Sequence, residues 1–261
     1  MVAFLAWVIL IAPLGVAVWL AISPRTRRSP IAPKLAIASV MLCAVISFLF
    51  WMTGAEETNS SFAWMSLGDT TIELGVMVDP LSILMLLVVG FVGSAIFIFA
   101  LGYMKGDPSI GRFYAKFALF VFSMLGIVLA NNFLMMFVFW ELVGASSYLL
   151  IGYYHEKPSA VDAGKKAFLT NRVADFGFLL GILMIWDLTG SFSFTGIEQA
   201  VADGALDGKG SGTLAFASFL IFLGAAGKSA QIPFHVWLPD AMEGPTPVSA
   251  LMHAEIGRAH V

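Results

Sequence analysis

The sequence predicts an all-α integral membrane protein, built as a bundle of transmembrane helices. Two observations predict this class. Hydrophobic residues make up 59% of the 261 positions and charged residues 12%, with a mean hydropathy of +0.89, which is too apolar for a soluble domain of this length. The apolar residues are also gathered in runs of about 20, the length at which a helix crosses a bilayer. We therefore expect a lipid bilayer around most of the chain.

Six apolar runs are long enough to span a membrane, and a seventh begins at Thr213. The predicted spans are 2–22, 32–52, 80–103, 113–130, 133–153 and 167–186. We interpret the first run as an uncleaved span and not as a signal peptide, because no basic residue precedes it and Arg25, Arg27 and Arg28 follow it.

The orientation follows from the basic residues, which collect in cytoplasmic loops. Segment 23–34 holds three arginines and Lys34, whereas segment 53–79 holds five acidic residues and no basic one. Lys105, Arg112 and Lys116 continue the alternation on the inner side. We therefore expect an extracytoplasmic N-terminus and an extracytoplasmic loop 53–79.

The outer loop also carries a strand pattern. Ile72, Leu74 and Val76 alternate with polar residues and glycine, and the pair Gly68 and Asp69 separates them from the run 62–67. Alternation of this kind on both sides of a turn signal is typical of a β-hairpin. We expect a small extracytoplasmic hairpin, with an irregular linker as the alternative.

The remaining composition excludes several classes. The single cysteine, Cys43, lies in an apolar run, so this chain alone builds no disulfide, zinc cluster or cysteine-ligated iron–sulfur centre. The formal charge of −3 comes without a basic block, which argues against a nucleic-acid partner. The four histidines are scattered, so we expect no metal site in this chain.

Glu141 and Lys228 are the leading candidates for function, because each lies inside an apolar run. An ionised side chain at the centre of a spanning helix costs about 2.5 to 3.5 kcal/mol on insertion scales, so such residues usually pair and line ion or proton paths. The alternatives are a structural carboxylate at Glu141 and a lysine that reaches to the membrane surface at Lys228. Pro233 predicts a break or kink about one turn beyond Lys228, and a broken helix at membrane depth is tolerated where it lines a polar cavity.

Arg172 and Asp175 are three residues apart in the sixth predicted span, so they share a helix face and could pair with each other. A purely structural ion pair is the alternative there. If Glu141 and Lys228 meet at about 4 Å, their attraction at an effective dielectric near 20 is on the order of 4 kcal/mol. We therefore hypothesise that opening and closing that pair switches the protonation of Lys228.

Three long segments carry a family resemblance: GKSAQIPFHVWLPDAMEGPTPVSALMHA at 227–254, FWELVGASSYLLIGYY at 139–154 and VDPLSILMLLVVG at 78–90. They resemble the L-subunit (chain 5) family of proton-pumping NADH-quinone oxidoreductase, respiratory complex I. The resemblance implies an antiporter-like bundle of inverted five-helix repeats, each with one discontinuous helix. Residues 1–112 would hold helices 1–3, and 113–254 a truncated first repeat with the discontinuous seventh helix and the start of the eighth.

The resemblance also implies a function, which is proton translocation coupled to electron transport and ATP synthesis. Glu141 and Lys228 match the family's ion pair, and Arg172, Asp175 and the relay histidine at His253 match its other relay residues. His235 and Asp240 fall near the end of the broken helix and are weaker candidates. The chain itself would carry no cofactor, and NAD, FMN, iron–sulfur clusters and quinone would lie in partner subunits, membrane and peripheral. The location implied is the inner membrane of a bacterial-type cell.

Two alternatives remain at this stage. A subunit of a multisubunit sodium/proton antiporter would share the helical core, although EGPTPVSAL and GASSYLLIGYY favour the redox complex. A passive membrane scaffold is the other alternative, but it would not explain why charged residues lie inside the apolar runs. Residues 255–261 depart from the family pattern and can be encoded by DNA that resembles a sequencing adapter, so we expect an artefactual tail on a truncated fragment.

Overall fold

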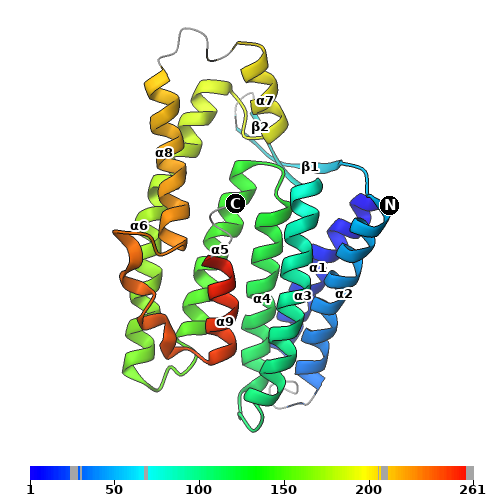
Figure 1. Cartoon of the computed structure of the whole chain (residues 1–261), viewed down its shortest axis with the longest axis vertical. Helices are drawn as coiled ribbons and strands as arrows, with labels where there is room; N and C mark the ends of the chain where they lie inside the picture. Colours follow the sequence, from blue (N-terminus) through cyan, green and yellow to red (C-terminus); the bar gives the residue numbers. More distant parts are fainter. Residues whose placement is uncertain (24–28, 30, 68–69, 205, 207–210, 257–261) are drawn as a thin grey trace.

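The structure, a computed structural model, describes residues 1–23, 29, 31–67, 70–204, 206 and 211–256. Within these residues the chain is mostly helical, with one two-stranded sheet (Figure 1). The helices are α1 (Val2–Ile22), α2 (Ile31–Thr53), α3 (Pro80–Tyr103), α4 (Ile110–Leu129), α5 (Phe133–Ile151), α6 (Pro158–Thr189), α7 (Phe194–Ala202), α8 (Ser211–Lys228) and α9 (Thr246–Ile256), and the strands are β1 (Thr58–Leu67) and β2 (Thr70–Val78).

Helices α1 to α6 are long and apolar enough to cross a membrane, and α8 is a shorter apolar helix. The six predicted spans are therefore confirmed, and the protein is a multi-pass membrane protein. The bounds of α1 and α3 agree with the prediction to the residue, because in these helices the apolar run and the helix have the same length.

Helix α6 differs most from its prediction. It begins at Pro158, nine residues before the expected start, and ends at Thr189, followed by Gly190, whose φ of 74° only glycine adopts readily. Its 32 residues extend about 48 Å, well beyond a hydrocarbon core of about 30 Å. The first turns carry Asp162, Lys165 and Lys166, so the apolar pattern could not reveal the part of the helix that leaves the bilayer.

Helix α4 forms the centre of one group of helices. It packs against α1 and α5, with α2 and α3 beside it (Figure 1). Its aromatic residues Phe113, Tyr114, Phe117 and Phe120 are fully buried. This aromatic core holds α1 to α5 together as one bundle.

Helices α6 and α8 form a close pair on the other side of α5 (Figure 1). Glycines permit the close approach: a Cβ placed on Gly181 would lie 2.8 Å from the carbonyl oxygen of Ala217 and the amide nitrogen of Ile221. Small residues at such contacts let two backbones approach in a membrane. The pair brings the polar residues of α6 next to the end of α8.

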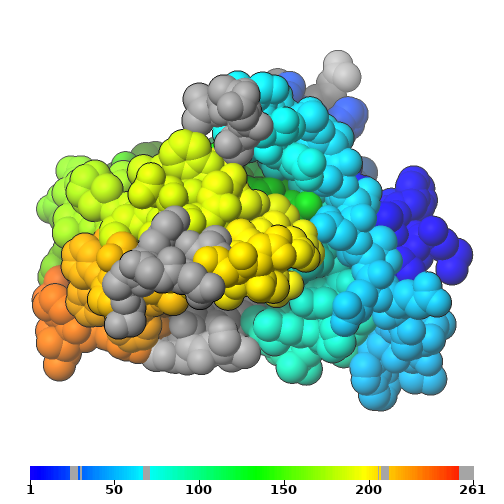
Figure 2. Space-filling model, turned by 90° about the horizontal axis from the view of Figure 1, so that it is seen from above, coloured from blue at the N-terminus to red at the C-terminus, as the bar shows by residue number. Residues whose placement is uncertain are grey.

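The two strands pair antiparallel at the residues where the alternation predicts strands, with Thr58 opposite Val78. Gly68 and Asp69 lie outside the described residues. Asn131 Nδ2 donates to Asn59 Oδ1 at 2.9 Å, and Asn132 Nδ2 donates to the carbonyl of Glu73 at 2.9 Å. These bonds attach the sheet to the turn between α4 and α5, and Figure 2 shows strand residues and α7 spread over this end of the bundle.

The α-helix is interrupted between α8 and α9. Helix α8 ends at Lys228 itself, and two short 3-10 helices, η2 (Phe234–Trp237) and η3 (Asp240–Glu243), lead to α9. The interruption predicted from Pro233 is therefore present, and it begins at the lysine. Ala230 has a φ of 51°, and Trp237 Nε1 donates to the carbonyl of Gly227 at 3.1 Å, which ties the connection back to α8.

Candidate functional site

The ionisable residues singled out in the sequence meet between α5, α6 and α8. Helix α5 contributes Glu141, α6 contributes Arg172 and Asp175, and the last residue of α8 is Lys228. The four residues form two ion pairs. The two pairs differ in burial and in how firmly they are held.

The deeper pair joins Lys228 and Asp175. Lys228 Nζ lies 3.9 Å from Asp175 Oδ2, and the side chains are 7% and 3% exposed. Trp140 Nε1 donates a 2.7 Å hydrogen bond to Asp175 Oδ1, while its ring centroid lies 5.9 Å from Lys228 Nζ. The ammonium makes no hydrogen bond to this carboxylate, which lies 3.9 Å away, so the carboxylate is anchored and the ammonium is held by charge and by the indole face.

The shallower pair joins Arg172 and Glu141, which are in direct contact. Their side chains are 44% and 18% exposed. The Arg172 guanidinium also lies over the Phe168 ring, 4.6 Å from its centroid. This pair therefore lies nearer the surface of the helix bundle than the Lys228–Asp175 pair.

The predicted pairing is wrong in both cases. Glu141 does not pair with Lys228, and Arg172 does not pair with Asp175, among the ion pairs of the described residues. The reason is helix rotation, since residues three apart on α6 point about 60° apart and each meets a different neighbour. Arg172 meets α5, and Asp175 meets the end of α8.

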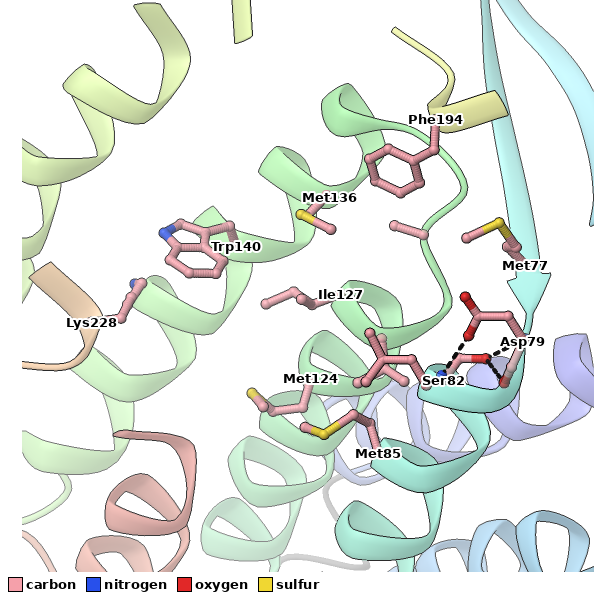
Figure 3. A pocket seen from close by; sticks show the side chains of 13 residues that line it. Met77, Asp79, Ser82, Met85, Met124, Ile127, Met136, Trp140, Phe194 and Lys228 are labelled. Atoms are coloured by element: carbon pink, nitrogen blue, oxygen red, sulfur yellow. Dashed lines mark hydrogen bonds between the residues drawn. The ribbon is translucent and has the colours of Figure 1, made fainter. Parts of the chain in front are cut away.

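Two cavities meet at Lys228. The larger, about 230 Å³, is lined mostly by apolar side chains, with Lys228 and Trp140 at one end and Met77, Asp79 and Ser82 at the other (Figure 3). Its far end lies beside the sheet. Asp79 caps α3 there, accepting a 2.6 Å hydrogen bond from the amide of Ser82.

The smaller cavity, about 20 Å³, lies on the other side of the lysine, toward the end of α5 and the beginning of α6. Gly144, Ser147, Tyr148 and Asn171 line it together with Lys228. The lysine is thus the side chain that both cavities share. The sequence did not reveal that Lys228 lies between two cavities, nor that Trp140 and Gly144 line them. Cavities result from the packing of helices and leave no pattern in the sequence.

The weaker candidates lie elsewhere. His235 is exposed in η2, and Asp240 in η3 pairs with Lys166 at 2.6 Å on the surface. His253 lies in α9, but its side chain is outside the described residues. Over the described part of the chain, no group of three or more histidine, cysteine or acidic residues could hold a metal ion.

Two family models match the chain. The model described as NADH:quinone oxidoreductase/Mrp antiporter, TM, matches residues 130–258. The model described as NADH-Ubiquinone oxidoreductase (complex I), chain 5 N-terminus, matches residues 64–114. All four ionisable residues of the site lie in the range of the first model.

Curated relatives agree with these models. The chain is 44% identical over 263 residues to NAD(P)H-quinone oxidoreductase chain 5 of Synechocystis sp., covering 96% of this chain and 38% of the relative. It is 42% identical over 260 residues to the chloroplastic subunit 5 of Cryptomeria japonica, covering 95% of this chain and 35% of the relative. The chain thus spans a little over a third of the length of these relatives.

Solved structures share the fold. A chain in the Mrp complex from Dietzia sp. superposes with a TM-score of 0.83 at 26% identity, over 97% of this chain and 27% of that one. A chain of the membrane-bound sulfane sulfur reductase, an archaeal respiratory membrane complex, superposes with a TM-score of 0.78 at 20% identity, over 99% of this chain and 51% of that one. The second likeness shows the fold alone.

Proposed function

Because the chain belongs to the chain-5 family of NADH:quinone oxidoreductase membrane subunits, we propose that it forms part of a proton-translocating subunit in which Lys228 carries the proton. The electron-transfer chemistry occurs in partner subunits, which hold the NAD, FMN, iron–sulfur and quinone sites. This chain contributes no cofactor and acts as an enzyme only within the complex.

The observation that carries this proposal is the position of Lys228 between two cavities on opposite sides of it. A proton carrier must exchange its proton with each side in turn. A buried amine whose carboxylate partner is 3.9 Å away suits that task, because no short hydrogen bond to that carboxylate must break first.

Asp175 supports this role by stabilising the protonated lysine. At 3.9 Å and an effective dielectric near 20, the two charges attract by about 4 kcal/mol. Moving one charge against 100 mV costs about 2.3 kcal/mol. Loss of this one ion pair therefore destabilises the protonated lysine by more than the cost of moving the charge.

Arg172 and Glu141 supply the switch. When quinone reduction in the complex displaces the Arg172 guanidinium from Glu141 toward Asp175, which lies one turn along α6, Asp175 gains a second cation and Lys228 loses part of its stabilisation. Return of Arg172 to Glu141 restores the lysine's affinity for a proton. Glu141 thus acts as a movable counter-charge through Arg172, and His253 continues the relay along α9.

The proposal includes an orientation and a location. The protein lies in the inner membrane of a bacterial-type cell, with the N-terminus, the sheet and α7 on the extracytoplasmic side. Residues 113–254 form the first antiporter-like repeat. The other membrane and peripheral subunits of the complex are the partners.

A subunit of a sodium/proton antiporter is the second candidate, because one matched model names Mrp antiporters and a chain of an Mrp complex shares the fold. The identity values favour the first proposal: the quinone oxidoreductase relatives reach 42% and 44%, against 26% for the Mrp chain.

The test uses the full-length protein in its complex. Lys228→Ala and Glu141→Gln should each abolish quinone-coupled proton pumping, measured in inverted membrane vesicles. The matched controls are Lys165→Ala and Asp162→Asn, which break an ion pair that is 58% and 75% exposed and worth little. If Lys228→Ala and Glu141→Gln both pump like the controls, the proposed roles are wrong.

A further inference from the structure

The smaller cavity beside Lys228 has the size and the lining of a binding site for a single water molecule. Its volume of about 20 Å³ exceeds the roughly 10 to 15 Å³ that one water needs. A buried water also requires two to four polar partners. The cavity offers three: the Lys228 ammonium, the Asn171 amide and the Ser147 hydroxyl.

Asn171 provides the strongest indication. Its side chain is buried, with 7% exposed, and Nδ2 donates a 2.8 Å hydrogen bond to the carbonyl of Ala167. That bond sets the orientation of the amide, because the reversed amide would place two oxygens against each other. The other end, Oδ1, is a buried acceptor without a hydrogen-bond partner among the described residues. Buried acceptors of this kind are rarely left unpaired.

Lys228 provides the matching donor. Its ammonium has three N–H groups, and its nearest anionic oxygen is 3.9 Å away, beyond hydrogen-bonding distance. Trp237, which also lines the cavity, already donates its indole N–H to the carbonyl of Gly227 at 3.1 Å. The unpaired donor and the unpaired acceptor therefore line the same small space.

Gly144 keeps this space open. A Cβ placed on Gly144 would lie 2.9 Å from Lys228 Nζ, so a side chain there displaces the ammonium or fills the cavity. Apart from the neighbouring residues and backbone of α5 itself, no other described heavy atom lies within 4 Å of that Cβ position. The absence of a side chain at residue 144 thus creates the room in which a water can contact Nζ.

We propose that one water molecule occupies this cavity, bridges Lys228 Nζ and Asn171 Oδ1, and passes protons to Lys228 from the side of the molecule where α5 ends. The transfer role rests on the proposed function of Lys228. When the neutral amine takes a proton from this water, the water takes one from a hydrated proton arriving from the aqueous phase, so the water is regenerated. Asn171 and Gly144 are positioning residues in this step.

The experiment uses the full-length protein in its complex, with the variants Asn171→Leu and Gly144→Ala and the control Gly102→Ala, a helical glycine with open space around its Cβ position. A high-resolution map of the unmodified complex should contain a density peak within hydrogen-bonding distance of Nζ and Oδ1. The peak should remain in Gly102→Ala and be absent in Gly144→Ala. Proton pumping should fall about tenfold in Asn171→Leu and in Gly144→Ala, the effect of one lost hydrogen bond on a barrier.

An empty cavity in a map that resolves other interior waters overturns the proposal. A peak together with pumping in both variants equal to that of Gly102→Ala overturns the relay role. Failure of the proposed function is recognised separately, because Lys228→Ala would then pump normally. If Lys228→Ala loses pumping while both variants match the control, the water relay is wrong and the function of Lys228 stands.

Discussion

Trp140 determines how Asp175 and Lys228 behave as a pair. Its indole N–H makes the 2.7 Å hydrogen bond to Asp175, and its ring faces the ammonium of Lys228. A hydrogen bond to a charged group contributes about 1.5 to 3 kcal/mol, more than a neutral one. The carboxylate is therefore anchored on α6 by a hydrogen bond, whereas its lysine partner on α8 lies 3.9 Å away.

Replacing Trp140 by phenylalanine tests this arrangement. We expect Trp140→Phe to slow proton pumping by at least about tenfold, because Asp175 loses the hydrogen bond that anchors it. Quinone-coupled pumping in membrane vesicles is the measurement. Trp186→Phe is the matched control, since the Trp186 N–H is buried without a hydrogen-bond partner among the described residues and its ring stacks on Phe192. Equal rates in the two variants would contradict the anchoring role.

At the scale of the elements, the contact between α6 and α8 decides whether the site forms. Lys228 is the last residue of α8, so its position relative to Asp175 depends on how closely the two helices approach. Gly177 and Gly181 on α6 and Gly224 on α8 each face the other helix at short distances. Because side chains in a membrane gain no hydrophobic free energy from leaving lipid, this close packing is what holds α8 against α6.

We expect Gly181→Ala to lower stability by about 1 to 3 kcal/mol, because the new methyl group meets the backbone of α8 and cannot rotate away. Thermal unfolding of the purified protein in detergent measures the change. Gly15→Ala in α1 is the control, with no atom within 4 Å of its Cβ position, and alanine favours a helix by up to about 1 kcal/mol. Similar stability in both variants would contradict the prediction, because it would show that α6 and α8 can move apart to make room for the methyl group without a loss of unfolding free energy.

At the scale of the whole molecule, the two ends of the bundle differ in chemistry. The sheet and α7 cover the end at which α4 stops and α5 starts. Near the opposite end lie Lys105 in the loop after α3, and Lys165 and Lys166 in the first turns of α6. Since basic residues collect on the cytoplasmic side, this distribution agrees with the proposed orientation, in which the sheet lies on the extracytoplasmic side.

Cysteine labelling tests this orientation. In a Cys43→Ala chain, which removes the single cysteine, Glu56→Cys should react with a membrane-impermeant maleimide added to intact cells. Lys105→Cys should react only after the membrane is opened, because α3 separates the two positions. Both native side chains are exposed. The reverse pattern would overturn the orientation, and labelling of both positions from the same side would contradict the membrane crossing of α3.

The class of the protein, its spans and its candidate site residues could all be predicted from the sequence. Helix α3 agrees to the residue, because a spanning segment must match the thickness of the hydrocarbon core and apolar length is visible in the sequence. The strands were visible from their alternation. Glu141 and Lys228 stood out because charge in an apolar run is costly wherever the chain folds.

Which charges pair, and which side chains surround them, could be seen only after the helices were placed in three dimensions. Lys228 pairs with Asp175, and Glu141 pairs with Arg172. Either acid could pair with either base on chemical grounds. The pairing depends on the rotation of α5 and α6 about their axes and on the residue at which α8 ends. The cavities on either side of Lys228 also depend on the fold, since they are the space left after α5, α6 and α8 have packed. The charge of each residue can be seen in the sequence, but the packing of the helices sets the distance between two charges. The attraction between them depends on that distance.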